Sequence, residues 1–188
     1  MYYHASPVRD IAVLEPRISN HGKPLVYLSQ KRENVLVYLS NAIERYCKET
    51  GFAHEGIWQK WAAYGFDPDG RQRIEEYYPD ALKKTYQGVS GYIYSAEALI
   101  TPDFDPRIPD AVATAEPVPV TGVEFVPDAY LAILEAAEQG LVRIHRYEDS
   151  NPRQLEWIRT TIQKEYEEAV DHPEYRHFLK GNFPDILG

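Results

Sequence analysis

The sequence predicts an α+β fold, in which strands and helices occupy separate blocks of the chain. Short β-rich runs bounded by turn residues recur along it, and helical periodicity gathers in longer segments between and after them. Because the two types do not alternate regularly, segregated helices and strands are expected rather than a parallel βαβ sheet. The expected strands cover residues 2–6, 24–29, 91–100, 118–126 and 141–147.

The first expected strand, YYHAS, is closed by Pro7. His4 and Ser6 are two residues apart, which is the strand period, so both side chains are expected on the same face. After the second strand, PLVYLS, apolar residues recur at intervals of three and four from residue 31 to 50. This spacing predicts a helix that ends at Gly51.

Residues 52–88 carry two or three short helical patterns around a Pro-Asp-Gly turn at 68–70, and a helical insert is expected there. A further helix is expected over 127–140, with a proline near its start and a glycine after its end. The last helix is expected to begin at Asn151. Pro152 occupies its first position and Gln154 its third, the pattern of a capping box.

The composition limits the classes of partner. The net charge is −9, with residues 1–100 neutral and the whole excess of acid in residues 101–188. This distribution argues against a broad nucleic-acid-binding surface, which needs a basic patch.

No apolar run approaches a membrane span and no apolar leader follows the first residues. A single cysteine, Cys47, is compatible with a reducing compartment. We therefore expect a cytoplasmic protein without membrane contact.

The common phosphate-binding and hydrolase motifs are missing from the sequence. It contains neither G-x-G-x-x-G nor G-K-[ST], which makes dinucleotide binding on a Rossmann fold and P-loop chemistry poor interpretations. It also lacks the G-x-S-x-G elbow and the H-E-x-x-H zinc motif. The remaining candidates for chemistry are polar residues on the expected strands.

Four segments, taken in order, carry a resemblance to a known family: YYHASP, GKPLVYLS followed by a helix, GYIYSAE, and AEPVPVTGVEFVPDAY leading on to GLVRIHRYED. This order resembles that of the rifampin ADP-ribosyltransferases and, more loosely, the catalytic domain of poly-ADP-ribose polymerases. The resemblance covers about residues 1–50 and 90–149. It implies a split β-sheet core within residues 1–150, interrupted by the insert at about 52–88. Residues 151–188 would then form a helical extension packed on this core.

The resemblance also implies which residues contact NAD. His4 and Ser6 match the family's first-strand histidine and hydroxyl residue, and would bond a ribose hydroxyl and the nicotinamide amide. Tyr27 matches the second-strand tyrosine, whose ring would stack on nicotinamide. Ser29 and Tyr38 would line the same cleft.

An acidic residue completes the family's site, and two positions match it. Asp105, followed by proline, corresponds to the Asp-Pro pair of the rifampin-modifying relatives. Glu116, before Pro117 and the next strand, corresponds to the glutamate of the polymerase-like relatives, and we favour it slightly.

The expected substrate is NAD, and the chemistry needs no metal. Breaking the bond between nicotinamide and ribose develops positive, oxocarbenium-like charge on the sugar, as glycoside hydrolysis does. A carboxylate beside that sugar stabilises the charge. The expected activity is therefore an ADP-ribosyl transfer, a kind of glycosyl transfer, to an acceptor that could be a small molecule, a protein or a nucleic acid.

Two other functions fit the same resemblance. One is a different reaction on the same fold, either NAD glycohydrolysis or the 2′-phosphotransferase reaction on RNA. The other is a binding module without catalysis, in which aromatic residues of the insert, such as Trp58 and Trp61, meet a partner.

Overall fold

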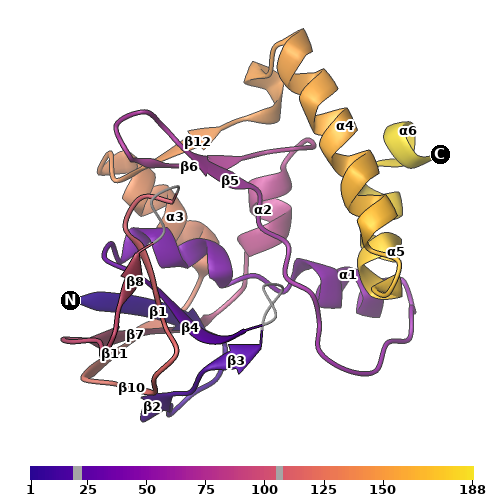
Figure 1. Cartoon of the computed structure of the whole chain (residues 1–188). Coiled ribbons are helices and arrows are strands. Elements are labelled where there is room, and N and C mark those ends of the chain that lie inside the picture. The colour runs from indigo at the N-terminus through magenta and orange to yellow at the C-terminus, as the bar shows by residue number, and fades with distance from the viewer. Residues whose placement is uncertain (19–22, 105–107) are drawn as a thin grey trace.

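The computed structural model describes residues 1–18, 23–104 and 108–188, and its main element is a seven-stranded antiparallel sheet. The strand order is β11-β7-β1-β4-β9-β8, with β3 paired to β4 (Figure 1). Sequential strands are therefore not simply neighbours, and β1 lies in the middle. The strands are β1 Tyr2–Ser6, β3 Arg17–Ile18, β4 Pro24–Ser29, β7 Gly91–Ala96, β8 Asp103–Phe104, β9 Ala111–Thr114 and β11 Gly122–Val126.

The large sheet is weakly joined between β1 and β4. β1 pairs with β7 over five residues and β4 pairs with β9 over four. Among the described residues, β1 and β4 pair only where Tyr3 lies opposite Ser29. Both strands continue beyond that point, toward Ser6 and toward Pro24, without further pairs between them, and the start of β4 pairs with β3 instead. The backbone groups that face the interruption must find other partners.

Two clusters of apolar side chains cover the sheet. Ala5 and Ile93 belong to one cluster, which includes residues of η1 (Glu33–Tyr38) and α3 (Ala129–Glu138). Leu28 and Tyr94 belong to the other, which lies beneath the two-stranded pair β2 (Val13–Leu14) and β10 (Val118–Pro119). Both faces of the sheet are therefore buried over much of its area, which explains the β-rich runs in the sequence.

The helix predicted over residues 31–50 is two elements. The first is the short 3-10 helix η1, and the second is α1 (Ala42–Glu49), with Ser40 and Asn41 between them. The Ser40 hydroxyl accepts the N–H of Ala42 at 3.5 Å. Serine and asparagine compete with the helix backbone for hydrogen bonds, which favours a break at this point.

The expectation of helices throughout the insert is wrong for its middle part. β5 (Tyr64–Phe66) and β6 (Gln72–Glu75) form a hairpin around the predicted turn at 68–70, and only α2 (Ala81–Tyr86) is helical. β6 also pairs in parallel with β12 (Val142–His145). A pairing with a strand so distant in sequence overrides local helical preference.

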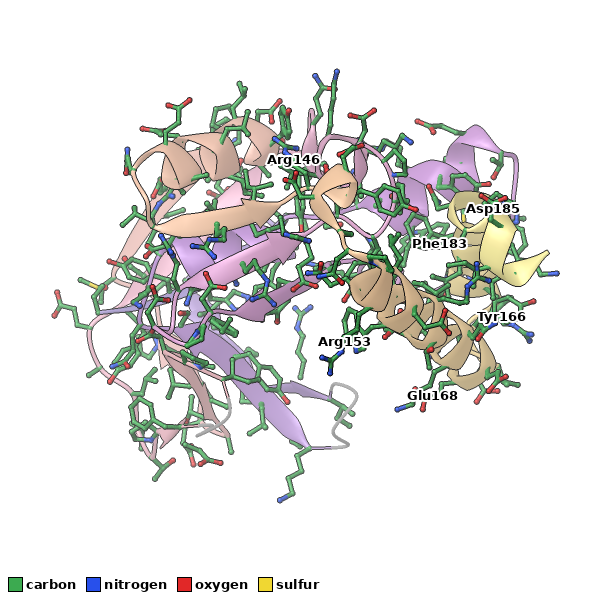
Figure 2. All side chains as sticks on the ribbon, turned by 90° about the horizontal axis from the view of Figure 1, so that it is seen from above. Arg146, Arg153, Tyr166, Glu168, Phe183 and Asp185 are labelled. Atoms are coloured by element: carbon green, nitrogen blue, oxygen red, sulfur yellow. The ribbon has the colours of Figure 1, made fainter. Side chains whose placement is uncertain are left out.

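The C-terminal helices form a separate group beside α1. They are α4 (Pro152–Glu168), α5 (Pro173–Asn182) and α6 (Pro184–Leu187). The predicted capping box is confirmed: Asn151 and Gln154 bond each other's backbone N–H groups. Phe183 is buried in an apolar cluster shared with α1, and Figure 2 shows it with Tyr166 at the end of the molecule away from the large sheet. Among the described residues, no helix is long and apolar enough to cross a bilayer.

Candidate functional site

His4 and Tyr27 meet where β1 and β4 stop pairing. His4 Nδ1 lies 2.8 Å from the carbonyl oxygen of Tyr27. A carbonyl only accepts hydrogen bonds, so Nδ1 carries the proton and donates it. The imidazole thus joins the two strands where their backbone ladder is interrupted, and its Nε2 is not used by this bond.

The environment keeps His4 neutral. Burial lowers its pKa below the usual 6.5, the bond to Tyr27 partly opposes this, and the charges of Lys60 and Arg17 lower it further. In the neutral ring with a proton on Nδ1, Nε2 carries a lone pair. His4 can therefore accept a hydrogen bond from a hydroxyl group of a ligand.

Three tyrosines bear on the predicted site. Tyr27 on β4 and Tyr38 at the end of η1 retain 38% and 41% of their surface exposed, so both rings can contact a ligand. The hydroxyl oxygens of Tyr38 and Tyr64 are 2.8 Å apart, and the two rings meet edge to face at 6.1 Å. Partial burial, followed by the effect of Tyr64, raises the pKa of Tyr38. The Tyr38 hydroxyl thus stays protonated, and its contact with Tyr64 orients the Tyr38 ring.

The two predicted serines have local structural roles. Ser6 Oγ accepts the N–H of Val8 at 3.2 Å, and Ser29 Oγ accepts the N–H of Lys31 at 3.1 Å. Both serines are buried. Each hydroxyl therefore closes the turn that follows its strand, and a ligand would meet them only through their remaining hydrogen-bonding capacity.

Of the two acidic candidates, the structure describes Glu116. Glu116 is exposed, and its N–H donates to Thr114 Oγ1. Ala113 is the β9 residue opposite Tyr27, and Glu116 follows in the bend after the end of β9. Among the described residues, Glu116 forms no hydrogen bond or ion pair with His4. Asp105 lies outside the described residues.

Sequence reasoning did not assign Lys60, Arg17, Tyr64 or Asp103 to the site. The charges of Lys60 and Arg17 lower the pKa of His4, and Tyr64 contacts Tyr38. Lys60 Nζ donates to the carbonyl of Tyr38 at 2.9 Å. Asp103 on β8 lies opposite Ala113, which itself lies opposite Tyr27, so Asp103 shares the Tyr27 face of the sheet. The sequence signal for Asp103 is its position two residues before the predicted Asp105 in the same acidic segment.

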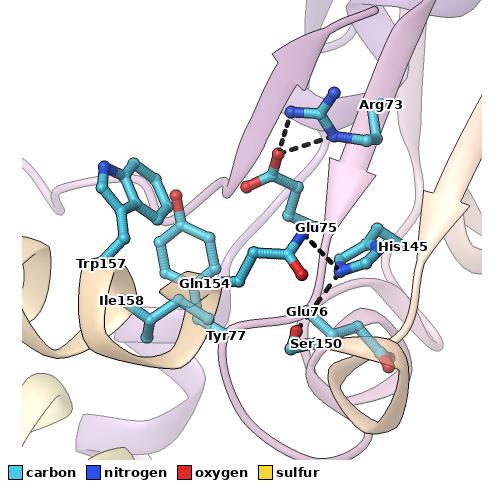
Figure 3. Close-up of a pocket in the computed structure, with 9 residues that line it drawn as sticks. All are labelled: Arg73, Glu75, Glu76, Tyr77, His145, Ser150, Gln154, Trp157 and Ile158. Carbon is cyan, nitrogen blue, oxygen red and sulfur yellow. Dashed lines mark hydrogen bonds and ion pairs between the residues drawn. The ribbon is translucent and has the colours of Figure 1, made fainter. Parts of the chain in front are cut away.

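A separate cavity of about 220 Å³ lies between β6, β12 and α4 (Figure 3). Its polar side chains pair mainly with one another: His145 Nε2 is 3.3 Å from both Ser150 Oγ and Gln154 Nε2, and Arg73 bonds Glu75. Ile74 faces the core, so its neighbours on β6 face away from it. Tyr64 pairs with Ile74 and shares its face, so this cavity and the Tyr38–Tyr64 contact lie on opposite sides of the small sheet.

A second cavity of about 420 Å³ is lined by residues that include Tyr92 and Tyr94 on β7. Neither cavity is lined by His4 or Tyr27. We nevertheless place the candidate site at His4, because its imidazole bonds the Tyr27 backbone where the ladder between β1 and β4 stops. In the part of the chain that the structure describes, no group of three or more His, Cys, Asp or Glu side chains could hold a metal ion.

Comparison with known proteins does not assign the chain to a family. No protein-family model matches it, and no curated protein or solved structure is significantly similar to it.

Proposed function

We propose that this protein is an NAD-dependent ADP-ribosyltransferase built on an ADP-ribosyltransferase-like split sheet. The observation that carries the proposal is the contact between His4 and Tyr27 at the interrupted β1–β4 ladder. The two residues are 23 positions apart, and the resemblance requires them at one site. Tyr38, implied by the same resemblance, is a second exposed ring.

The site's groups suit the nicotinamide half of NAD. The Tyr27 and Tyr38 rings offer apolar faces on which the flat nicotinamide stacks, a contact worth on the order of 0.5–1.5 kcal/mol for each ring. His4 Nε2 accepts a hydrogen bond from a ribose hydroxyl. The Tyr38–Tyr64 bond fixes one ring in advance, which reduces the entropy lost on binding.

The reaction is a substitution at the ribose C1′ atom. The bond between C1′ and the nicotinamide nitrogen breaks, and its electron pair leaves with nicotinamide, which becomes neutral. The acceptor's nucleophilic atom forms the new bond to C1′ and releases its proton. A carboxylate from Asp103, Asp105 or Glu116 stabilises the charge that develops on the sugar.

The test is incubation with NAD labelled separately in the nicotinamide and adenine parts. We expect nicotinamide release by the wild type, together with transfer of the adenine label to an acceptor. Tyr38→Ala is expected to reduce the release strongly and Tyr38→Phe weakly, because phenylalanine keeps the ring. Tyr166→Ala, on α4, is the control and should retain the wild-type rate.

The other possible results of this assay would indicate one of the alternative functions. Nicotinamide release in which only free ADP-ribose accumulates would indicate a glycohydrolase. Absence of both NAD binding and nicotinamide release would refute the proposal and favour a binding module. Asp103→Asn, Asp105→Asn and Glu116→Gln, compared in the same assay, identify the carboxylate, because only the residue beside the sugar should lower the rate by roughly 100-fold or more.

A further inference from the structure

The cavity of about 220 Å³ between β6, β12 and α4 has two unlike walls (Figure 3). Trp157 and Ile158 of α4, with Tyr77 after β6, form an apolar wall. Glu75 of β6 and His145 of β12 belong to the polar wall. The volume lies below the roughly 300–1,000 Å³ of pockets for drug-sized molecules. The cavity therefore suits a ligand of about one ring that is apolar on one face and polar elsewhere.

Trp157 supplies the aromatic surface of this cavity. It keeps 52% of its surface exposed, and its indole meets the Tyr77 ring edge to face, with the ring centroids 5.6 Å apart. Tyr77 is held in turn by the buried Trp61, whose ring centroid lies 5.9 Å away. These contacts orient the indole before a ligand arrives, which reduces the entropy lost on binding.

The charged side chains that line the cavity are paired within the protein. Arg73 donates to Asp67 and to Glu75, each at 2.8 Å. Glu76 accepts from Arg146 at 3.2 Å, and its two oxygens also accept backbone N–H groups. Because each charge already has a partner of opposite sign, the cavity offers little net field to an ion. A neutral polar ligand fits this balance better than an ionic one.

Two hydrogen-bonding atoms in the cavity remain available. Both bonds from the Arg73 guanidinium go to Oε1 of Glu75, as Figure 3 shows, which leaves Oε2 to accept. Among the described residues, the Tyr77 hydroxyl has no hydrogen-bond partner, and neither it nor Oε2 of Glu75 is sealed from solvent. Burial raises the pKa of Tyr77, so its hydroxyl stays protonated and can donate. A ligand hydroxyl can thus donate to Glu75 or accept from Tyr77.

We propose that this cavity binds a neutral sugar, with the C–H face of the sugar ring against Trp157 and its hydroxyl groups bonded to Glu75 and Tyr77. A sugar ring has an apolar C–H face and a rim of hydroxyls that both donate and accept. A flat nucleobase is best held between two apolar surfaces, and an organic ammonium would be repelled by Arg73. The cavity and the Tyr38–Tyr64 contact lie on opposite sides of the small sheet, so this inference does not depend on the proposed function.

The experiment is saturation-transfer NMR on the full chain, with glucose, galactose, mannose, xylose and N-acetylglucosamine as probes. Saturation of the protein should pass most strongly to the ring C–H protons of a bound sugar, because these face the indole. Titration should give a dissociation constant on the order of 1 mM for a ligand of this size. Trp157→Ala should weaken binding by at least about tenfold, and Trp157→Phe should weaken it less, because phenylalanine keeps part of the aromatic face.

Tyr77→Phe isolates the contribution of one hydroxyl. The oxygen that it removes bonds no described residue of the protein, so the fold should be retained. Sugar binding should weaken by about threefold to tenfold, because one hydrogen bond to the ligand is lost. Tyr166→Phe, on α4 but outside the cavity, is the matched control and should bind sugar as the wild type does.

Three results would overturn the inference. The first is the absence of saturation transfer to all five sugars. The second is an unchanged sugar affinity in Trp157→Ala, because the sugar would then lie elsewhere on the protein. The third concerns two competing probes, adenosine and tetramethylammonium. If either binds the wild type more tightly than every sugar and loses this affinity in Trp157→Ala, the cavity is a site for a nucleobase or an ammonium group instead.

Discussion

Two substitutions at His4 separate its structural role from its proposed functional one. Asparagine places an N–H donor three bonds from Cα, as Nδ1 of histidine does, so His4→Asn can keep the bond to the Tyr27 carbonyl. It has no group at the position of Nε2. His4→Ala removes both the N–H donor to the Tyr27 carbonyl and the acceptor at the position of Nε2. The two variants should therefore differ in stability but not in activity.

The expected magnitudes follow from the contacts. A neutral hydrogen bond contributes about 1 kcal/mol net, so His4→Ala should lower the free energy of unfolding by about that amount. His4→Asn should lie within about 0.5 kcal/mol of the wild type. Both variants should lose roughly tenfold to 100-fold in nicotinamide release, because each lacks the acceptor for the ribose hydroxyl.

The assays are urea unfolding at pH 8, where His4 is neutral, and nicotinamide release from NAD. His177→Asn, at a histidine that contacts Thr50 and Phe52 instead, is the control for both measurements. Wild-type activity in His4→Asn would refute the role of Nε2. An equal loss of stability in His4→Asn and His4→Ala would refute the view that the Nδ1 bond joins the strands.

Three further predictions concern stability. Because burial lowers the pKa of His4 below 6.5, the unfolded chain binds more protons at mildly acidic pH, so stability should fall as the pH drops below about 6.5. His4→Asn should flatten this part of a stability curve measured by urea unfolding between pH 5 and 8. Gly181→Ala should destabilise by about 1–3 kcal/mol, because a methyl group there would overlap the Tyr46 ring, and thermal melting should show partial rescue by Tyr46→Leu. Asn151→Ala should cost about 1 kcal/mol in the same melts through loss of the α4 cap, and no change would contradict the capping box.

Local sequence signals were reliable where neighbouring residues decide the structure. The start of α4 depends on Asn151, Pro152 and Gln154, which lie within one turn of helix, and the structure has the predicted cap. The insert shows the opposite case. β6 is a strand because β5 and β12 pair with it, and the latter lies some seventy residues away. No local pattern carries that information.

The residues of the candidate site show the same contrast between local and long-range information. His4, Tyr27 and Tyr38 were found from residue types in an ordered series, and the structure brings His4 and Tyr27 into contact. Ser6 and Ser29 fitted the same series, but a sequence does not reveal that their hydroxyls close local turns. Lys60 could not have been identified, because an isolated lysine in an irregular segment resembles any surface lysine.

The sequence by itself determined the α+β class, the strand that carries His4, the strand that carries Tyr27 and the capped start of α4. These properties follow from the strand period, helical periodicity and capping chemistry, all of which act over a few residues. Only the tertiary structure decided that the β1–β4 ladder stops after one pair and that the charges of Lys60 and Arg17 lower the pKa of His4. These depend on packing between segments far apart in the chain, whose net free energy no local pattern encodes.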